Sequence, residues 1–279
     1  MAARCSKNVL GQSSCPIPSI DSVCTGPAGF LGRAYIDGQA FFAYTERQTR
    51  QKGGARPVRI PYIVGMGAAY TAALWLLVRR VRRPGRGYLP EKALCSLCFV
   101  AAAAVCAAMG SRPEAFWRLL PALLCCLVGD VVLALYNRLR RPGLFLAGLA
   151  AFLAGHALFV WGLCRLQPMG WPVPLAAALG AGGAAALSGR PGMHTGRMRP
   201  WVVLYAAFVS ALLGKGLQLA FGIAQPWCFL VLAGAALFWV SDLLILFLYF
   251  YPGKHPAVHA ANLLTYYYAM FLIAASLAF

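Results

Sequence analysis

The stretch LLCCLVGDVVLALY, residues 123–136, is apolar except for Asp130, and AALFWVSDLLILFLYF, residues 235–250, repeats the pattern with Asp242. Such runs predict membrane-spanning helices, because a helix needs about 20 mostly apolar residues to cross a bilayer. A charge at the centre of a span costs about 2.5 to 3.5 kcal/mol on insertion scales and usually faces the bundle interior or a wet cavity. The two aspartates therefore indicate a functional site inside a membrane protein.

The composition of the whole chain agrees with this reading. Of its 279 residues 61% are hydrophobic and only 11% are charged, whereas a soluble domain has about 25% charged residues. The formal net charge is +18, and most basic residues flank apolar runs. This placement favours membrane topology and contact with anionic lipid headgroups over binding of nucleic acid. We expect membrane lipids, and no nucleic acid, as partners.

Eight apolar segments follow residue 58, separated by short basic or Pro/Gly-rich breaks. They cover residues 60–78, 93–110, 117–136, 144–164, 171–188, 200–222, 227–250 and 258–279. The segments are longer than barrel strands and show no sustained period-two alternation, which predicts an all-α, polytopic transmembrane bundle of about eight spans. Alanine and glycine run through the fourth and fifth segments, where small residues let helices approach closely in lipid.

The first 57 residues differ from the rest, since they are rich in Gly, Ser, Gln and Arg. They lack the basic stretch followed by an apolar stretch that marks a secretory signal. We predict a mostly disordered tail over residues 1–57 and an eight-helix transmembrane domain over residues 58–279.

The distribution of basic residues predicts an orientation for a multi-pass protein that we expect in the endoplasmic reticulum. The loops after the first, third, fifth and seventh segments, taken to include Lys92, hold most of the basic residues, and the opposite loops hold Arg112, Arg118 and Arg165. The positive-inside rule then places the basic loops in the cytosol and both termini outside it. Basic residues at the end of the tail, such as Arg56 and Arg59, favour the opposite orientation.

Further polar residues lie within the apolar segments. His156 is in the fourth, Tyr205 and Lys215 are in the sixth, and Thr265 to Tyr268 open the last. Simpler explanations exist. His156 could be a core histidine bonded to a backbone carbonyl, and Lys215 could reach the membrane interface. Thr265 to Tyr268 could form an interfacial aromatic belt. The aspartates themselves could be structural hydrogen-bonding groups. Two carboxyl groups, an imidazole, an ammonium and several phenols in one bundle nevertheless favour a functional site.

No motif of a serine hydrolase, zinc protease or nucleotide-binding loop occurs in the chain. The single Cys-x-x-Cys, Cys95 to Cys98, has no second pair and no nearby histidine at ligand spacing, so we expect no metal and no cofactor. Two carboxyl groups without a metal-ligand cluster indicate general acid and base catalysis involving water.

Four short motifs in order resemble the YhhN-like lysoplasmalogenase family of eight-span membrane enzymes. They are Val128-Gly129-Asp130, then Phe145, Gly148, Phe152 and His156 at fixed spacing, then Gly234-Ala235 with Phe238 and Ser241-Asp242, and finally Thr265-Tyr266-Tyr267. The resemblance covers roughly residues 60–279. The chain departs from the family at Met270, where a glutamine is common, and in the stretch NRLRRPG after Asp130.

The resemblance implies hydrolysis of the vinyl ether bond of lysoplasmalogen, which yields a fatty aldehyde and glycerophosphocholine or glycerophosphoethanolamine. It places the catalytic aspartates at Asp130 and Asp242. His156, Lys215, Tyr205, Ser241, Tyr266 and Tyr267 are the residues that we expect to bind the lysophospholipid substrate.

An enol ether is hydrolysed by protonation of its β-carbon, addition of water to the resulting oxocarbenium ion, and collapse of the hemiacetal. The reaction needs a neutral acid and a carboxylate, and two close carboxyl groups in a low-dielectric site can share one proton. We therefore hypothesise that Asp130 and Asp242 form such a pair. Two alternatives remain open: a proton-coupled transporter, in which buried Asp, His and Lys carry protons, and an inactive lysolipid-binding member of the family.

Overall fold

The computed structural model describes residues 59–82, 87–253 and 255–279. Within these residues the chain is all-helical, with no strand, which confirms the predicted fold class. The helices are α2 (Arg59–Val81), α3 (Leu89–Met109), α4 (Pro113–Leu139), α5 (Pro142–Cys164), α6 (Pro172–Ser188), α7 (Arg199–Gly222), α8 (Pro226–Phe250) and α9 (Pro256–Ala275), with short 3-10 turns at Gly196–Met198 and Ser276–Ala278. The tail predicted for residues 1–57 lies outside the described residues.

The helices are apolar enough for a multi-pass membrane protein. Seven of those described, all except α6, have the length and hydropathy of a membrane span. Helix α6 is apolar but has only 17 residues, at the lower limit of about 17 residues for crossing a bilayer.

Proline in the first turn sets where most of these helices begin. Each helix from α3 to α9 carries a proline at its first or second position, where the missing N–H would have no partner in the helix anyway. Helices α3 and α4 therefore start four residues before the predicted apolar segments, at Leu89 and Pro113. The earlier start of α3 places Lys92 inside a helix, although the sequence analysis counted it with a loop.

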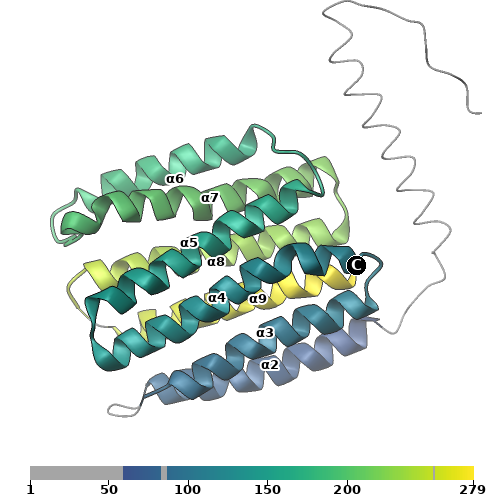
Figure 1. Ribbon diagram of the computed structural model, residues 1–279, viewed down its shortest axis with the longest axis horizontal. Helices are drawn as coiled ribbons and strands as arrows, with labels where there is room; N and C mark the ends of the chain where they lie inside the picture. The colour runs from purple at the N-terminus through teal and green to yellow at the C-terminus, as the bar shows by residue number, and fades with distance from the viewer. Residues whose placement is uncertain (1–58, 83–86, 254) are drawn as a thin grey trace, which may run out of the picture. The chain divides into compact units, whose positions relative to one another are not determined.

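Short connections make successive helices antiparallel (Figure 1). Helix α4 packs between α3 and α5, while α9 packs against α2, α3 and α8. Helix α7 contacts α5, α6 and α8, and α6 packs mainly on α7. The last turns of α2, α4, α6 and α8 and the first turns of α3, α5, α7 and α9 lie at one end of the bundle (left in Figure 1), which we call the basic-loop end.

Glycines let the helices of this bundle pack closely, as predicted. Gly148, Gly155 and Gly162 recur every seven residues along α5 and face α4; an added Cβ at Gly162 would lie 2.9 Å from the carbonyl oxygen of Arg118. On α4, a Cβ at Gly129 would lie 2.8 Å from the ring of Phe152. The glycine beside Asp130 therefore allows α5 to approach α4.

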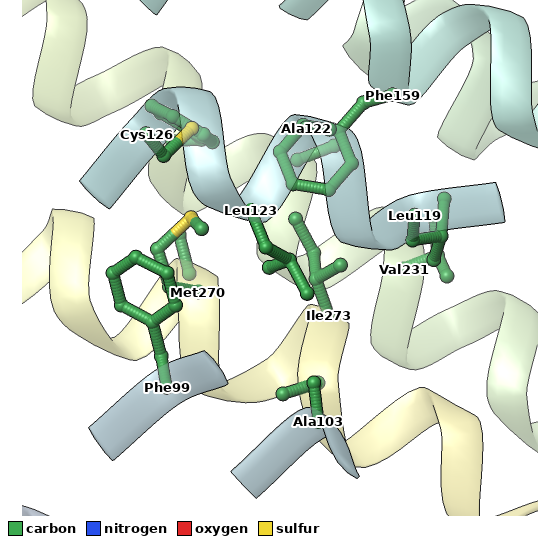
Figure 2. Packing of buried hydrophobic residues seen from close by; sticks show 14 of the residues in the cluster. Phe99, Ala103, Leu119, Ala122, Leu123, Cys126, Phe159, Val231, Met270 and Ile273 are labelled. Atoms are coloured by element: carbon green, nitrogen blue, oxygen red, sulfur yellow. The ribbon is translucent and has the colours of Figure 1, made fainter. Parts of the chain in front are cut away.

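An apolar cluster fills the middle of the bundle (Figure 2). It draws Phe99 and Ala103 from α3, Leu123 from α4, and Met270 and Ile273 from α9. On α3, α4 and α9 these residues lie three to seven residues farther from the basic-loop end than Ser96, Asp130 and Tyr266, respectively. Asp130 and its partners thus lie between an apolar core and the basic-loop end.

Candidate functional site

Asp130 is buried, 1% exposed, and is contacted by three polar side chains from two other helices, α3 and α9. Lys92 of α3 forms an ion pair with Oδ1 at 3.1 Å. Ser96 of α3 and Tyr266 of α9 each donate a hydroxyl to Oδ2 at 2.7 Å. An ionised carboxylate acts only as an acceptor, and this arrangement supplies it with one cationic and two neutral donors. The donors around Asp130 therefore suit an ionised carboxyl group.

Lys92 was wrongly assigned to a loop in the sequence analysis. Lys92 is only 8% exposed, and its side chain pairs with Asp130. The signal that identifies it is Pro90, because a proline marks the first turn of a helix and Lys92 follows it by two residues. A lysine buried inside a helical bundle is expensive unless it is paired.

A second layer of hydrogen bonds orients the donors of Asp130. The Tyr267 hydroxyl lies 3.1 Å from both the Ser96 hydroxyl and the carbonyl oxygen of Lys92, and its single proton can be donated to either oxygen. Tyr70 of α2 in turn donates to the Tyr267 carbonyl at 3.0 Å. Tyr266 and Tyr267 are buried, so the alternative that they form an interfacial belt is wrong.

Asp242 on α8 is 7% exposed and lies against His156 of α5. The Nε2 atom of His156 is 3.1 Å from Oδ2 of Asp242, and the Tyr205 side chain of α7 interacts with the same carboxyl group. The ring of Tyr205 also packs edge-on against the imidazole, with centroids 5.3 Å apart. The structure thus brings together three of the predicted site residues.

The other nitrogen of His156 faces a backbone carbonyl. Nδ1 lies 2.7 Å from the carbonyl oxygen of Phe152, and because a carbonyl can only accept, Nδ1 is the donor of that hydrogen bond. This bond leaves Nε2, 3.1 Å from Oδ2 of Asp242, as the imidazole nitrogen that faces the carboxyl group.

The two aspartates belong to neighbouring but separate networks. The Phe238 ring lies between them, with its centroid 4.5 Å from that of His156 and 5.3 Å from that of Tyr266. In the part of the chain that the structure describes, no hydrogen bond joins the two carboxyl groups. Each aspartate has a basic partner of its own instead, Lys92 for Asp130 and His156 for Asp242.

Lys215 lies apart from both carboxyl groups. Its ammonium group donates to the carbonyl oxygens of Gln167 and Pro168, at 2.6 and 3.2 Å, in the loop between α5 and α6. It also contacts Gln218 at 3.3 Å. Lys215 is ten residues beyond Tyr205, about 15 Å along a helix, so the two share α7 but reach different ends of the bundle.

Ser241 faces α9 and supports the position of its neighbour Asp242. Asn262 donates to the backbone carbonyl and the hydroxyl of Ser241, both at 2.9 Å. Gly234, seven residues before Ser241 in the same motif, lets α9 pack closely against α8. A Cβ added at Gly234 would lie 3.0 Å from the Ala269 carbonyl oxygen. Asn262 is a site residue that the sequence analysis missed.

Met270 lies one turn after Tyr266 and is fully buried in the apolar cluster of Figure 2. Its thioether is compatible with these apolar neighbours. Met270 therefore packs on the side of the Asp130 network that faces away from the basic-loop end.

These features define a class of protein: a multi-pass α-helical membrane protein with a buried polar site built by α3, α4, α5, α7, α8 and α9. Residues 88–277 match the YhhN family, and the chain belongs to that family. No curated protein and no solved structure gives a significant match.

Proposed function

We propose that the protein is a membrane hydrolase that cleaves the vinyl ether bond of lysoplasmalogen. The observation that carries this proposal is that the two buried aspartates have different partners. Asp130 is surrounded by the donors Lys92, Ser96 and Tyr266, which suit a carboxylate, whereas Asp242 faces the His156 imidazole, with which we propose it shares one proton. Hydrolysis of an enol ether requires one group of each kind.

In the proposed mechanism the Asp242–His156 pair is the acid. It transfers its proton to the β-carbon of the vinyl ether, and the electron pair of the double bond forms the new C–H bond. The α-carbon and the ether oxygen then share a positive charge. A proton donor fixed within hydrogen-bonding reach of its target contributes about 10²- to 10⁴-fold to a rate.

Asp130 is the base in this scheme. Its negative charge stabilises the oxocarbenium ion, which a fixed charge does effectively in a site that excludes water. Asp130 then takes a proton from the water molecule that adds to the α-carbon. The resulting hemiacetal gives its hydroxyl proton back to the Asp242–His156 pair and receives the proton of Asp130 on the glycerol oxygen. The C–O bond breaks, both aspartates return to their starting states, and the products are a fatty aldehyde and a glycerophosphodiester.

The proposal includes glycerophosphocholine or glycerophosphoethanolamine as the second product and the endoplasmic reticulum as the location. What supports them is membership of the YhhN family together with the multi-pass helical bundle. Tyr205, Tyr266 and Tyr267 are proposed to contact the substrate from the two networks, and Ser241 acts through Asp242.

The experiment that tests this function measures aldehyde release from lysoplasmenylethanolamine by the purified protein and its Asp130→Asn and Asp242→Asn variants. We expect turnover by the natural protein and a loss of at least about 100-fold in each variant. Near-normal turnover by either variant would exclude the proposed pair.

A second candidate function is proton-coupled transport, which buried Lys–Asp and His–Asp pairs also serve in other membrane proteins. The Lys92–Asp130 pair, 3.1 Å apart and buried, is the observation in its favour. Proteoliposomes distinguish the two functions: a transporter accumulates intact lysolipid, whereas the hydrolase releases aldehyde without any proton gradient. An inactive lysolipid-binding protein would do neither.

A further inference from the structure

Four polar side chains lie between Asp130 and the basic-loop end of the bundle. They are Tyr88, Asn137, Tyr249 and His259, and we call them the vestibule cluster. The amide nitrogen of Asn137 donates to the hydroxyl oxygens of Tyr88 and Tyr249, at 2.7 and 3.3 Å, and the Tyr88 ring packs edge-on against His259 with centroids 6.0 Å apart. All four are partly buried. The cluster thus joins the start of α3 to α4, α8 and α9.

Lys92 connects the vestibule cluster to Asp130. Its ammonium group interacts electrostatically with Tyr88, Tyr249 and His259 as well as with Asp130. An ammonium has three N–H donors, and among the described residues Asp130 is the only side chain that accepts one from Lys92. No other side chain in residues 59–82, 87–253 and 255–279 accepts from this nearly buried cation, and leaving a buried donor unpaired is costly.

The proposed substrate places an anion at this position. Only a three-carbon glycerol unit separates the vinyl ether oxygen from the phosphate, a reach of about 7 Å, comparable to two residues of extended chain. If the vinyl ether lies at the aspartates, the phosphate lies within this reach of the vinyl ether oxygen and therefore close to Asp130. On the far side of Asp130 from the basic loops the bundle is filled by the apolar cluster of Figure 2, which offers an anion no donors.

We propose that Lys92 and the vestibule cluster bind the phosphate of the lysolipid, so that the headgroup points to the basic-loop end. This inference rests on the proposed function, because it places the vinyl ether at the aspartates. Lys92 supplies charge-assisted hydrogen bonds to the phosphate, and the hydroxyls of Tyr88 and Tyr249 supply neutral ones. The exposed arginines of the α4–α5 connection, Arg138, Arg140 and Arg141, attract the anion toward this end. Lys215, which the sequence analysis expected to bind the substrate, donates to loop carbonyls instead.

The test compares an alkenyl glycerophosphoethanolamine with the matching alkenylglycerol, which has the same vinyl ether and no phosphate. The variant is Asn137→Leu combined with Tyr249→Phe, and the matched control is Tyr251→Phe, an exposed tyrosine at the same end of the bundle. We expect the double variant to raise KM for the phosphate-bearing substrate about tenfold or more, to leave KM for the alkenylglycerol unchanged, and the control to alter neither. An equal rise for both substrates, or no rise for either, overturns the proposal.

A binding measurement separates failure of this proposal from failure of the proposed function. If the natural protein releases no aldehyde from either substrate, the hydrolase assignment fails. Binding of a saturated alkyl-ether lysophospholipid, which cannot be hydrolysed by this route, then tests the headgroup site alone. Weaker binding by the double variant, with binding of the saturated alkylglycerol unchanged, supports the site. Unchanged lysophospholipid binding, or inorganic phosphate that competes at a lower concentration than glycerophosphoethanolamine, overturns it.

Discussion

Replacing Lys92 with methionine tests whether Asp130 is held as a buried carboxylate. The substitution keeps the length of the side chain and removes its charge, so that Asp130 retains only the hydroxyl donors Ser96 and Tyr266. Removing one partner of a buried ion pair costs about 3–5 kcal/mol. Because two hydrogen bonds to the carboxylate remain, we expect a loss near the lower limit, about 3 kcal/mol. For a domain of this size that lowers the midpoint of thermal unfolding by about 10 °C.

The double variant Lys92→Met with Asp130→Asn makes this prediction specific. Replacing both partners of a buried pair is often close to neutral, so the double variant is expected to recover most of the lost stability while remaining inactive. Arg138→Met, an exposed cation at the end of α4, is the control and should change the midpoint little. The assay is thermal unfolding in detergent followed by aldehyde release at a temperature where each variant is folded. Equal midpoints for the natural protein and Lys92→Met would refute the reasoning, as would a double variant less stable than Lys92→Met.

Three further predictions follow from single contacts. Gly129→Ala places a Cβ 2.8 Å from the Phe152 ring and should destabilise the protein by about 1–3 kcal/mol, measured by thermal unfolding; an unchanged midpoint contradicts the α4–α5 packing described. His156→Gln leaves Asp242 without a partner that can carry its proton and should lower kcat by about 100-fold or more with the protein still folded, whereas near-normal kcat shows that Asp242 needs no such partner. Lys215→Met removes the donor of the α5–α6 loop carbonyls and should lower the unfolding midpoint by several degrees; a midpoint equal to that of the natural protein would show that the loop does not depend on it.

The helical bundle and both aspartates were predictable from the sequence because each rests on a local signal. Apolar segments of span length predict helices wherever they occur, and an aspartate inside one is conspicuous without knowledge of its neighbours. His156 and Tyr205 were predicted for the same reason, and the structure places both against Asp242.

The partners of each aspartate could not be predicted because they depend on how the helices rotate against one another. Lys92 lies at the edge of an apolar segment, where a lysine usually reaches the interface, and only its packing against α4 turns it toward Asp130. Asn262 likewise matters only because α9 lies against α8 at Ser241. The hypothesis that the two aspartates pair directly required α4 and α8 to turn these side chains toward each other. In the structure each aspartate instead faces a basic partner of its own, Lys92 or His156.

The most direct test of the central claim is hydrolysis of a lysoplasmenyl lipid in heavy water, followed by mass spectrometry of the aldehyde. If the Asp242–His156 pair protonates the β-carbon, the aldehyde formed by the natural protein carries one deuterium on the carbon next to the carbonyl. Asp242→Asn should then form almost no aldehyde above the uncatalysed background. An aldehyde released by the natural protein without that deuterium, or formed at the natural rate by Asp242→Asn, would contradict the account.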